Sequence, residues 1–362
     1  MTTLTVPLQS AARALSRQVL QRFEDLRMTA TFASTTGPIA VRVALRRALR
    51  GPKYPTWGIA HEVLAETMQS EAKLLMSLDP SAIRRRIPTT PLMPSLRRRV
   101  RVSHRELAGR PAMVLQPREI LAPDRPVLLY FHGGGYVFGS NQTHKDLMTR
   151  LAVDADLMCI GFDYRLAPEC PFPSGLGDCR KALLALYEEG VAPKNVFIGG
   201  DSAGAALALS TLITMRDAGE PMPRGAVVLS PWVDLSCTGR SIEENATFDY
   251  LGTEVLRHFA SMYLPEGISV RDPLASPLYA DLQGLPPLFL QVGGAEGLRS
   301  EVERFAERAE EAGVDVTLEV WRGMTHAFQG LAVLVREGRH ALRSAADWID
   351  HLASGDPTSS ES

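Results

Sequence analysis

A serine between two glycines stands in the segment GDSAG, at positions 200–204. An apolar run precedes it at 195–200, and a helical pattern follows it at 203–218. Small neighbours let the chain make the tight strand-to-helix turn that exposes a nucleophilic serine. A glycine- and alanine-rich turn that happens to contain a serine is the alternative, but the flanking strand and helix favour the nucleophile. We predict that Ser202 is catalytic.

Three consecutive glycines follow His132 at the end of another apolar run. Backbone N–H groups of glycines can approach a developing oxyanion with no side chain in the way. We predict that Gly133 and Gly134 donate to this oxyanion together with Ala203, whose N–H opens a helix. A flexible turn is the alternative, which the serine turn downstream makes the weaker interpretation. His132 is expected to brace the loop rather than to titrate.

A serine hydroxyl needs a base to remove its proton. Of the eight histidines, only His326 lies in a loop directly after a late apolar strand pattern, at 314–321. Parallel strands end at one edge of their sheet, so this loop is expected beside the serine. We predict that His326 is the base.

An acid is expected between the serine and the histidine in the sequence, after the preceding strand. Glu296 is the first acid past the apolar run 287–294. Its predicted role is to fix the tautomer of the imidazole and to stabilise the imidazolium. Glu301 and Glu303 are the fallbacks, but they are expected on the next helix as solvated charges.

The apolar runs set the fold class. Over the last 260 residues, short apolar runs alternate with helical patterns, which indicates a mostly parallel sheet covered by helices on both faces. Residues 98–117 read as a leading hairpin-like pair, and 331–352 as a final helix. The fold is therefore expected to be α/β.

The domain prediction has three parts. Residues 1–97, with helical patterns near 8–28 and 57–78, form a helical cap, and residues 98–352 form the catalytic domain. A mostly helical insertion, 232–275, is expected to contribute to the cap. The polar residues 353–362 are expected to be a disordered tail.

Several segments together resemble the hormone-sensitive-lipase-like family of bacterial carboxylesterases, within the α/β-hydrolase fold. They are FHGGGYVFGS (131–140), DYRLAPECPFP (163–173), GDSAGAALA (200–208), SPWVDL (230–235), DPLASPL (272–278), LPP (285–287), VGGAEGLRSE (292–301) and GMTHAF (323–328). The resemblance covers roughly residues 98–350. It implies an eight-stranded sheet, a helical N-terminal cap, no cofactor and the hydrolysis of short- to medium-chain acyl esters.

The resemblance also supports Ser202, His326, the acid at position 296 and the three oxyanion donors. This sequence departs from the family in carrying glutamate at 296, where aspartate is usual. Tyr136 and Phe138 beside the glycine loop could contact substrate or simply pack. A homodimer is plausible from the family alone.

The distribution of charge along the chain bears on which partners the protein can bind. The net charge of −2 hides an asymmetry, because residues 1–100 carry 16 Lys and Arg against 6 Asp and Glu, and the remainder 23 against 35. A basic front part can bind nucleic acid or an anionic surface, but aromatic residues are not interleaved with it, which favours a basic lid on an acidic body. The expected partner is a small-molecule ester, without nucleic acid and without stable membrane insertion.

The compartment is predicted from two features. No apolar run approaches the roughly 18 residues that span a bilayer, and the first 26 residues lack a secretory apolar stretch. The four cysteines show no metal or redox spacing, and their number suits a reducing compartment. We predict a cytoplasmic protein with no metal.

Other functions stay open at this point. The same site could open lactones, cleave arylamides or deacetylate a metabolite. A non-catalytic binder is also conceivable, because gibberellin receptors resemble this family but lack the histidine that His326 supplies here. Residues 41–51 (VRVALRRALRG) could form a membrane-surface helix, although their arginines do not segregate to one face, which favours a solvated or lid-packed helix.

Overall fold

The chain divides into two compact units, Met1–Met68 and Gln69–Ser362. The structure, a computed structural model, describes residues 36–87, 89, 92–118 and 125–355. The helix predicted over 8–28 and residues 356–362 of the tail predicted over 353–362 lie outside the described residues. Residues 353 and 354 continue the last helix, so the tail does not begin at 353.

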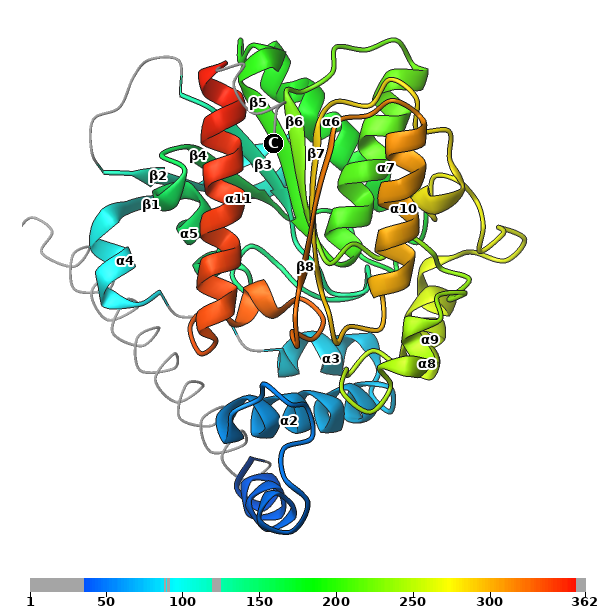
Figure 1. The fold of residues 1–362 in the computed structure, drawn as a ribbon. Helices are drawn as coiled ribbons and strands as arrows, with labels where there is room; N and C mark the ends of the chain where they lie inside the picture. Colours follow the sequence, from blue (N-terminus) through cyan, green and yellow to red (C-terminus); the bar gives the residue numbers. More distant parts are fainter. Residues whose placement is uncertain (1–35, 88, 90–91, 119–124, 356–362) are drawn as a thin grey trace, which may run out of the picture. The chain divides into compact units, whose positions relative to one another are not determined.

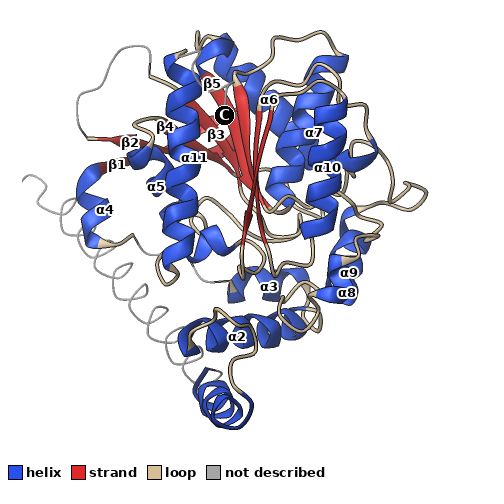
Figure 2. Cartoon of the chain, viewed as in Figure 1, coloured by secondary structure: helices blue, strands red, loops and turns tan. Residues whose placement is uncertain are grey.

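An eight-stranded sheet forms the centre of the second unit, as predicted (Figure 2). Its order is β1-β2-β4-β3-β5-β6-β7-β8. The first three strands of this order pair antiparallel, and all the other pairs are parallel. The strands are β1 (Val100–Leu107), β2 (Arg110–Pro117), β3 (Val127–Phe131), β4 (Met158–Phe162), β5 (Val196–Asp201), β6 (Gly225–Leu229), β7 (Leu288–Gly293) and β8 (Val316–Trp321).

Helices cover both faces of this sheet (Figure 1). On β3, Leu129 and Phe131 join one apolar core while Leu128 and Tyr130 join the other, because successive side chains of a strand point to opposite faces. This explains why the central strands β3, β5, β6 and β7 are buried along their whole length, with no alternation of apolar and polar residues. One face is covered by α6 (Ser174–Glu188), α7 (Ala203–Asp217) and α10 (Arg299–Glu311), the other by α5 (Lys145–Asp154) and α11 (Arg336–Ser354).

The insertion 232–275 contains two helices, α8 (Ser241–Glu244) and α9 (Thr253–Tyr263). The remainder is loop, so the prediction of a mostly helical insertion is wrong. In the first of these loops a side chain takes the place of a backbone acceptor, because the carboxylate of Asp234 accepts the backbone N–H groups of Ser236 and Thr238. The insertion is therefore mostly loop with two helices, and hydrogen bonds from polar side chains stabilise its first loop.

One longer helix, α2 (Ile59–Leu75), and several short ones lie outside the two layers that cover the sheet. The short ones are α3 (Pro80–Arg86), α4 (Pro94–Arg99), η1 (Pro193–Asn195), η2 (Pro277–Tyr279) and η3 (Phe328–Leu331). The helical pattern noted near 57–78 agrees with α2.

An arginine-rich helix over residues 36–50 belongs to the first unit. Its Arg42, Arg46 and Arg47 pair with the buried carboxylates of Glu62 and Glu66. These arginines are therefore engaged within the protein, which favours the packed helix over the membrane-surface helix. None of the helices that the structure describes combines the length and apolar character that crossing a bilayer requires.

Candidate active site

Ser202 occupies the turn between the end of β5 and the start of α7, with φ at 53°. A positive φ is energetically unfavourable for a residue that has a Cβ, and such backbone strain is concentrated at functional sites. A Cβ at Gly200 would lie 2.5 Å from the carbonyl oxygen of Phe131, and one at Gly204 would lie 2.1 Å from it. Only glycine fits at either position, which is the physical basis of the GDSAG pattern.

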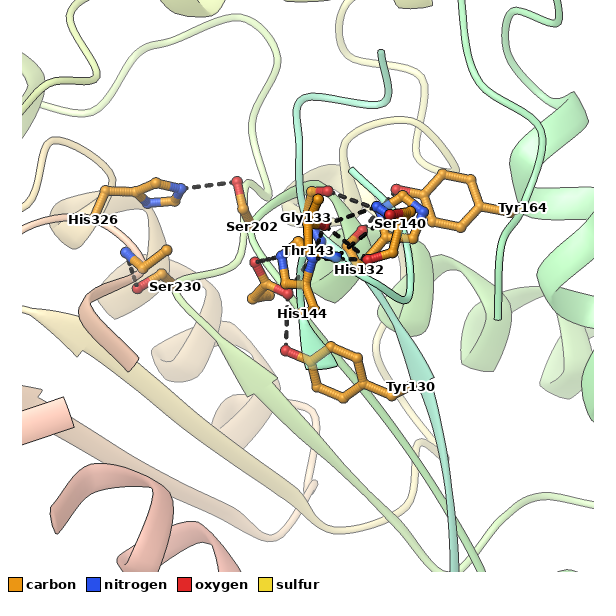
Figure 3. A network of polar contacts seen from close by, with 12 residues as sticks. Tyr130, His132, Gly133, Ser140, Thr143, His144, Tyr164, Ser202, Ser230 and His326 are labelled. Atoms are coloured by element: carbon orange, nitrogen blue, oxygen red, sulfur yellow. Dashed lines mark hydrogen bonds and ion pairs between the residues drawn. The ribbon is translucent and has the colours of Figure 1, made fainter. Parts of the chain in front are cut away.

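The three residues predicted as nucleophile, base and acid lie in contact. The imidazole of His326 points toward Ser202, with 2.8 Å between Nε2 and Oγ (Figure 3). On its other side, Nδ1 lies 2.7 Å from Oε1 of Glu296. The three side chains follow β5, β8 and β7, whose carboxyl ends meet at one edge of the parallel sheet.

The carboxylate of Glu296 is fully buried, and donors surround it. Its Oε2 accepts the hydroxyl of Ser230 and the N–H of Gly293, both at 2.8 Å. Its Oε1 is left for His326, whose Nδ1 must carry the proton because the carboxylate only accepts. Nε2 is therefore free to accept the proton of Ser202.

The two fallback acids are engaged elsewhere. Glu301 lies on α10 as expected, but it is buried rather than solvated, and it accepts the N–H of Gly239 at 3.0 Å. Glu303 pairs with Arg299 at 2.7 Å on the same helix. The glutamate at 296 thus contacts the histidine despite being one methylene longer than the usual aspartate.

The electrostatics of the pocket favour a charged His326. Burial by itself lowers the pKa of this imidazole, but the charge of Glu296 and its hydrogen bond outweigh burial and raise the pKa above 6.5. The charges of Asp249 and Asp201 act in the same direction. The site is therefore built to stabilise the imidazolium that forms when the histidine takes a proton.

The glycine loop differs from the prediction at one position. The N–H of Gly133 donates to Oδ1 of Asp201 at 3.0 Å, so it is not available to an oxyanion, and its assignment as a donor is wrong. Within the described chain, the N–H groups of Gly134 and Gly135 have no hydrogen-bond partner. The N–H of Ala203 lies in the first turn of α7, where helical N–H groups lack intrahelical acceptors. Of these N–H groups, those of Gly134, Gly135 and Ala203 remain without an acceptor in the described structure.

Asp201 is the polar centre beneath this loop. Besides the N–H of Gly133, its carboxylate accepts the hydroxyl of Tyr130 at 2.8 Å and contacts Nε2 of His144 at 3.1 Å. Burial raises the pKa of Asp201, but the charge of His144 and these hydrogen bonds outweigh it and hold the pKa below 3.8. An ionised Asp201, the residue directly before Ser202, therefore holds the glycine loop against the turn of the serine.

His132 braces the loop, in agreement with its expected role. Its Nδ1 contacts the carbonyl oxygen of Gly133 at 2.8 Å, and its ring stacks on Tyr164 with 4.5 Å between centroids. Burial, together with the charge of His144, lowers the pKa of His132 to about 4. The ring is neutral at ordinary pH.

Four supporting residues were missed at the level of the sequence: Tyr130, His144, Asp201 and Ser230. The position of Asp201 directly before the nucleophile is the one signal that could have drawn attention to it. Tyr130, His144 and Ser230 are brought to the site by the tertiary structure, and no sequence pattern marks them.

The two aromatic candidates have different surroundings. Tyr136 is buried and stacks on Tyr263, with 3.6 Å between ring centroids, which favours packing over substrate contact. Phe138 is half-buried and meets Phe259 edge-on at 5.6 Å. Phe138 stays a candidate for substrate contact.

Comparison with known proteins identifies the family of the chain. Residues 128–330, more than half of the chain, match the family model described as "alpha/beta hydrolase fold". The chain belongs to the α/β-hydrolase fold family. This α/β-hydrolase is 42% identical to an acetyl-hydrolase of Streptomyces hygroscopicus over 62% of its own length and 76% of the relative's. It is 32% identical to the carboxylesterase NlhH of Mycobacterium tuberculosis, over 69% and 82% of the two chains.

Solved structures give the same result. A mutant of the esterase E40 superposes with a TM-score of 0.76 at 37% identity, covering 83% of this α/β-hydrolase and 99% of the other chain. An esterase from the bacterial hormone-sensitive lipase family superposes with a TM-score of 0.70 at 34% identity, covering 88% and 98%. The resemblance to hormone-sensitive-lipase-like carboxylesterases is thereby confirmed.

Metal ligands do not gather in the described residues, where no group of three or more His, Cys, Asp or Glu side chains could hold an ion. The four cysteines are free thiols.

Proposed function

We propose that the protein is a serine carboxylesterase that hydrolyses short- to medium-chain acyl esters through an acyl-enzyme on Ser202. The observation that carries the proposal is the unbroken chain of contacts from Glu296 through His326 to the hydroxyl of Ser202, at 2.7 and 2.8 Å. The names of the relatives, acetyl-hydrolase and carboxylesterase, support an ester as substrate.

The reaction follows from the positions of donors and acceptors. Nε2 of His326 takes the proton of Ser202 as Oγ attacks the carbonyl carbon of the ester. The carbonyl oxygen gains charge and is stabilised by the N–H groups of Gly134, Gly135 and Ala203. The imidazolium then protonates the leaving alcohol, and the acyl group stays on Oγ. Water repeats the cycle, so that the carboxylic acid leaves and Ser202 regains its proton.

The contact chain also bears on the alternatives. Binding alone does not require a histidine between a buried carboxylate and a strained serine. The arrangement therefore favours a catalytic protein over a non-catalytic binder. Lactones, arylamides and acetylated metabolites would use the same three residues, so they are alternative substrates rather than alternative sites.

The Ser202→Ala variant tests the proposal. We expect it to lose the hydrolysis of p-nitrophenyl acetate and butyrate while its circular dichroism stays that of the wild type. A fluorophosphonate probe should label the wild type on Ser202 and leave the variant unlabelled. Full ester hydrolysis by the variant would end the proposal, and a series of acyl lengths run beside lactones and arylamides would define the substrate class.

Three further parts of the proposal come from the sequence. They are a helical cap made of residues 1–97 with a contribution from 232–275, a cytoplasmic location and a homodimer. The first follows from the helical patterns, the second from cysteine usage and the third from the family.

A further inference from the structure

A buried carboxylate outside the three proposed catalytic residues contacts two of their loops. Asp249 lies in the segment between α8 and α9 and is 3% exposed. Its Oδ1 accepts the backbone N–H of His326 at 3.0 Å and that of Tyr250 at 2.9 Å. Its Oδ2 accepts the backbone N–H of Gly297 at 2.7 Å. One side chain thus joins the histidine loop to the loop of the acid.

Burying the charge of Asp249 is unfavourable, so the groups that compensate for it indicate what the residue does. No arginine or lysine pairs with Asp249 within the described residues. An ionised carboxylate without a cation is expensive to bury unless hydrogen bonds to it are strong. Its three donors are backbone amides, and two of them, those of His326 and Gly297, belong to the loops of the histidine and the acid. The charge of His326 also acts on this carboxylate and lowers its pKa.

The surrounding segment reinforces the same connection. Asn245 donates its amide Nδ2 to the carbonyl oxygen of Glu296 at 2.8 Å, and the hydroxyl of Tyr250 donates to the carbonyl oxygen of His326 at 3.2 Å. A Cβ at Gly297 would lie 2.7 Å from the carbonyl oxygen of Leu251, so the chain passes directly against the acid loop. Residues 245–251 therefore hold the backbone around both side chains.

We propose that Asp249 is a positioning residue for the reaction. It holds the backbone of His326 and Gly297 so that the imidazole stays between Glu296 and Ser202, and its charge adds to that of Glu296 in stabilising the imidazolium. This inference rests on the proposed esterase function.

The charges that face His326 come from several elements. Glu296 follows β7, Asp201 ends β5 and Asp249 precedes α9, and all three raise the pKa of the imidazole. Burial raises the pKa of Asp249 to about 6, and the charge of Glu296 adds to this while that of His326 opposes it. Asp249 is therefore ionised in the neutral and alkaline range, where an esterase with a neutral histidine works.

The Asp249→Asn variant tests the role. An asparagine can accept through its oxygen, but its NH2 group would face the N–H of Gly297 or that of His326, and the charge is lost. We expect kcat for p-nitrophenyl butyrate to fall about ten- to hundredfold, the usual effect of misplacing a catalytic group. KM should stay close to that of the wild type. The acid limb of the profile of kcat/KM against pH should move about one unit toward lower pH, because a neighbouring negative charge has been removed from His326.

Asp234→Asn is the matched control. Asp234 is also a buried aspartate of the insertion, but it accepts its hydrogen bonds from Ser236 and Thr238 and contacts no catalytic loop. We expect this variant to lose thermal stability without moving the acid limb. A merely structural role for Asp249 would give the same pattern in Asp249→Asn, and that outcome would overturn the inference.

A second variant covers the case in which Asp249→Asn does not fold. Asp249→Glu keeps the charge but displaces the carboxylate by one methylene, so kcat should fall while the acid limb stays at its wild-type pH. Wild-type kcat in Asp249→Glu would contradict the positioning role. If the wild-type protein itself hydrolyses no ester, the proposed function fails; an active wild type with an unchanged Asp249→Asn variant refutes the positioning role alone.

Discussion

Replacing Glu296 by glutamine is expected to lock His326 in the wrong tautomer. The side chain of Glu296 has one oxygen, Oε2, that faces two donors, the hydroxyl of Ser230 and the N–H of Gly293. A carboxamide keeps these bonds only when its oxygen takes this place. Its NH2 group then faces Nδ1 of His326, which must become an acceptor, so that the imidazole proton moves to Nε2. A protonated Nε2 in a neutral ring cannot take the proton of Ser202.

The reversed amide would restore the correct tautomer at a cost. The hydroxyl of Ser230 can rotate, but the N–H of Gly293 cannot, and it would be left facing an NH2 group. An unsatisfied buried N–H costs roughly 1–3 kcal/mol, which favours the unproductive orientation. The corresponding aspartate-to-asparagine change in a serine protease lowers kcat about 10⁴-fold, or about 5.4 kcal/mol of barrier. We expect a loss of about 10³- to 10⁴-fold here.

The assay is steady-state hydrolysis of p-nitrophenyl butyrate, with thermal unfolding followed by circular dichroism as a check on folding. Glu303→Gln is the matched control, because Glu303 was a fallback acid and pairs with Arg299 on α10. This control should keep wild-type kcat. If Glu296→Gln loses less than about tenfold, its amide does not impose the tautomer, and the reasoning from the two donors on Oε2 is wrong.

Two further predictions concern the pH dependence and the glycine loop. Because the pKa of His326 is raised above 6.5 and only the neutral imidazole can accept a proton, kcat/KM should fall as the pH drops through a value above 6.5; a rate that stays constant well below pH 6.5 would contradict this assignment. Gly134→Ala places a Cβ 2.2 Å from the carbonyl oxygen of Phe138 at a φ of +122°, so the loop must move and one oxyanion donor is displaced. Such a loss costs about 10²- to 10³-fold in kcat, whereas the control Gly177→Ala, whose Cβ meets no atom within 4 Å, should leave kcat unchanged; equal activities would remove Gly134 from the oxyanion site.

Local features of this chain are readable from the sequence because they depend on neighbours along it. The glycines at 200 and 204 report a turn that leaves no room for a Cβ, and the apolar runs report strands buried on both faces. The order of serine, acid and histidine, each directly after a strand pattern, places all three at one edge of a parallel sheet. The fold could be predicted on these grounds, and so could the contacts that join Ser202, His326 and Glu296.

The hydrogen-bond partners at that edge depend on the tertiary structure. Gly133 and Gly134 cannot be told apart from the sequence, because they are neighbouring glycines of one motif. The N–H of Gly133 is occupied because the fold places Asp201, 68 residues away, beside it. Ser230 and Asp249 likewise reach the site from segments without a catalytic pattern of their own. A donor finds its acceptor through the register of the strands and the path of the loops, and neither periodicity nor composition records that pairing.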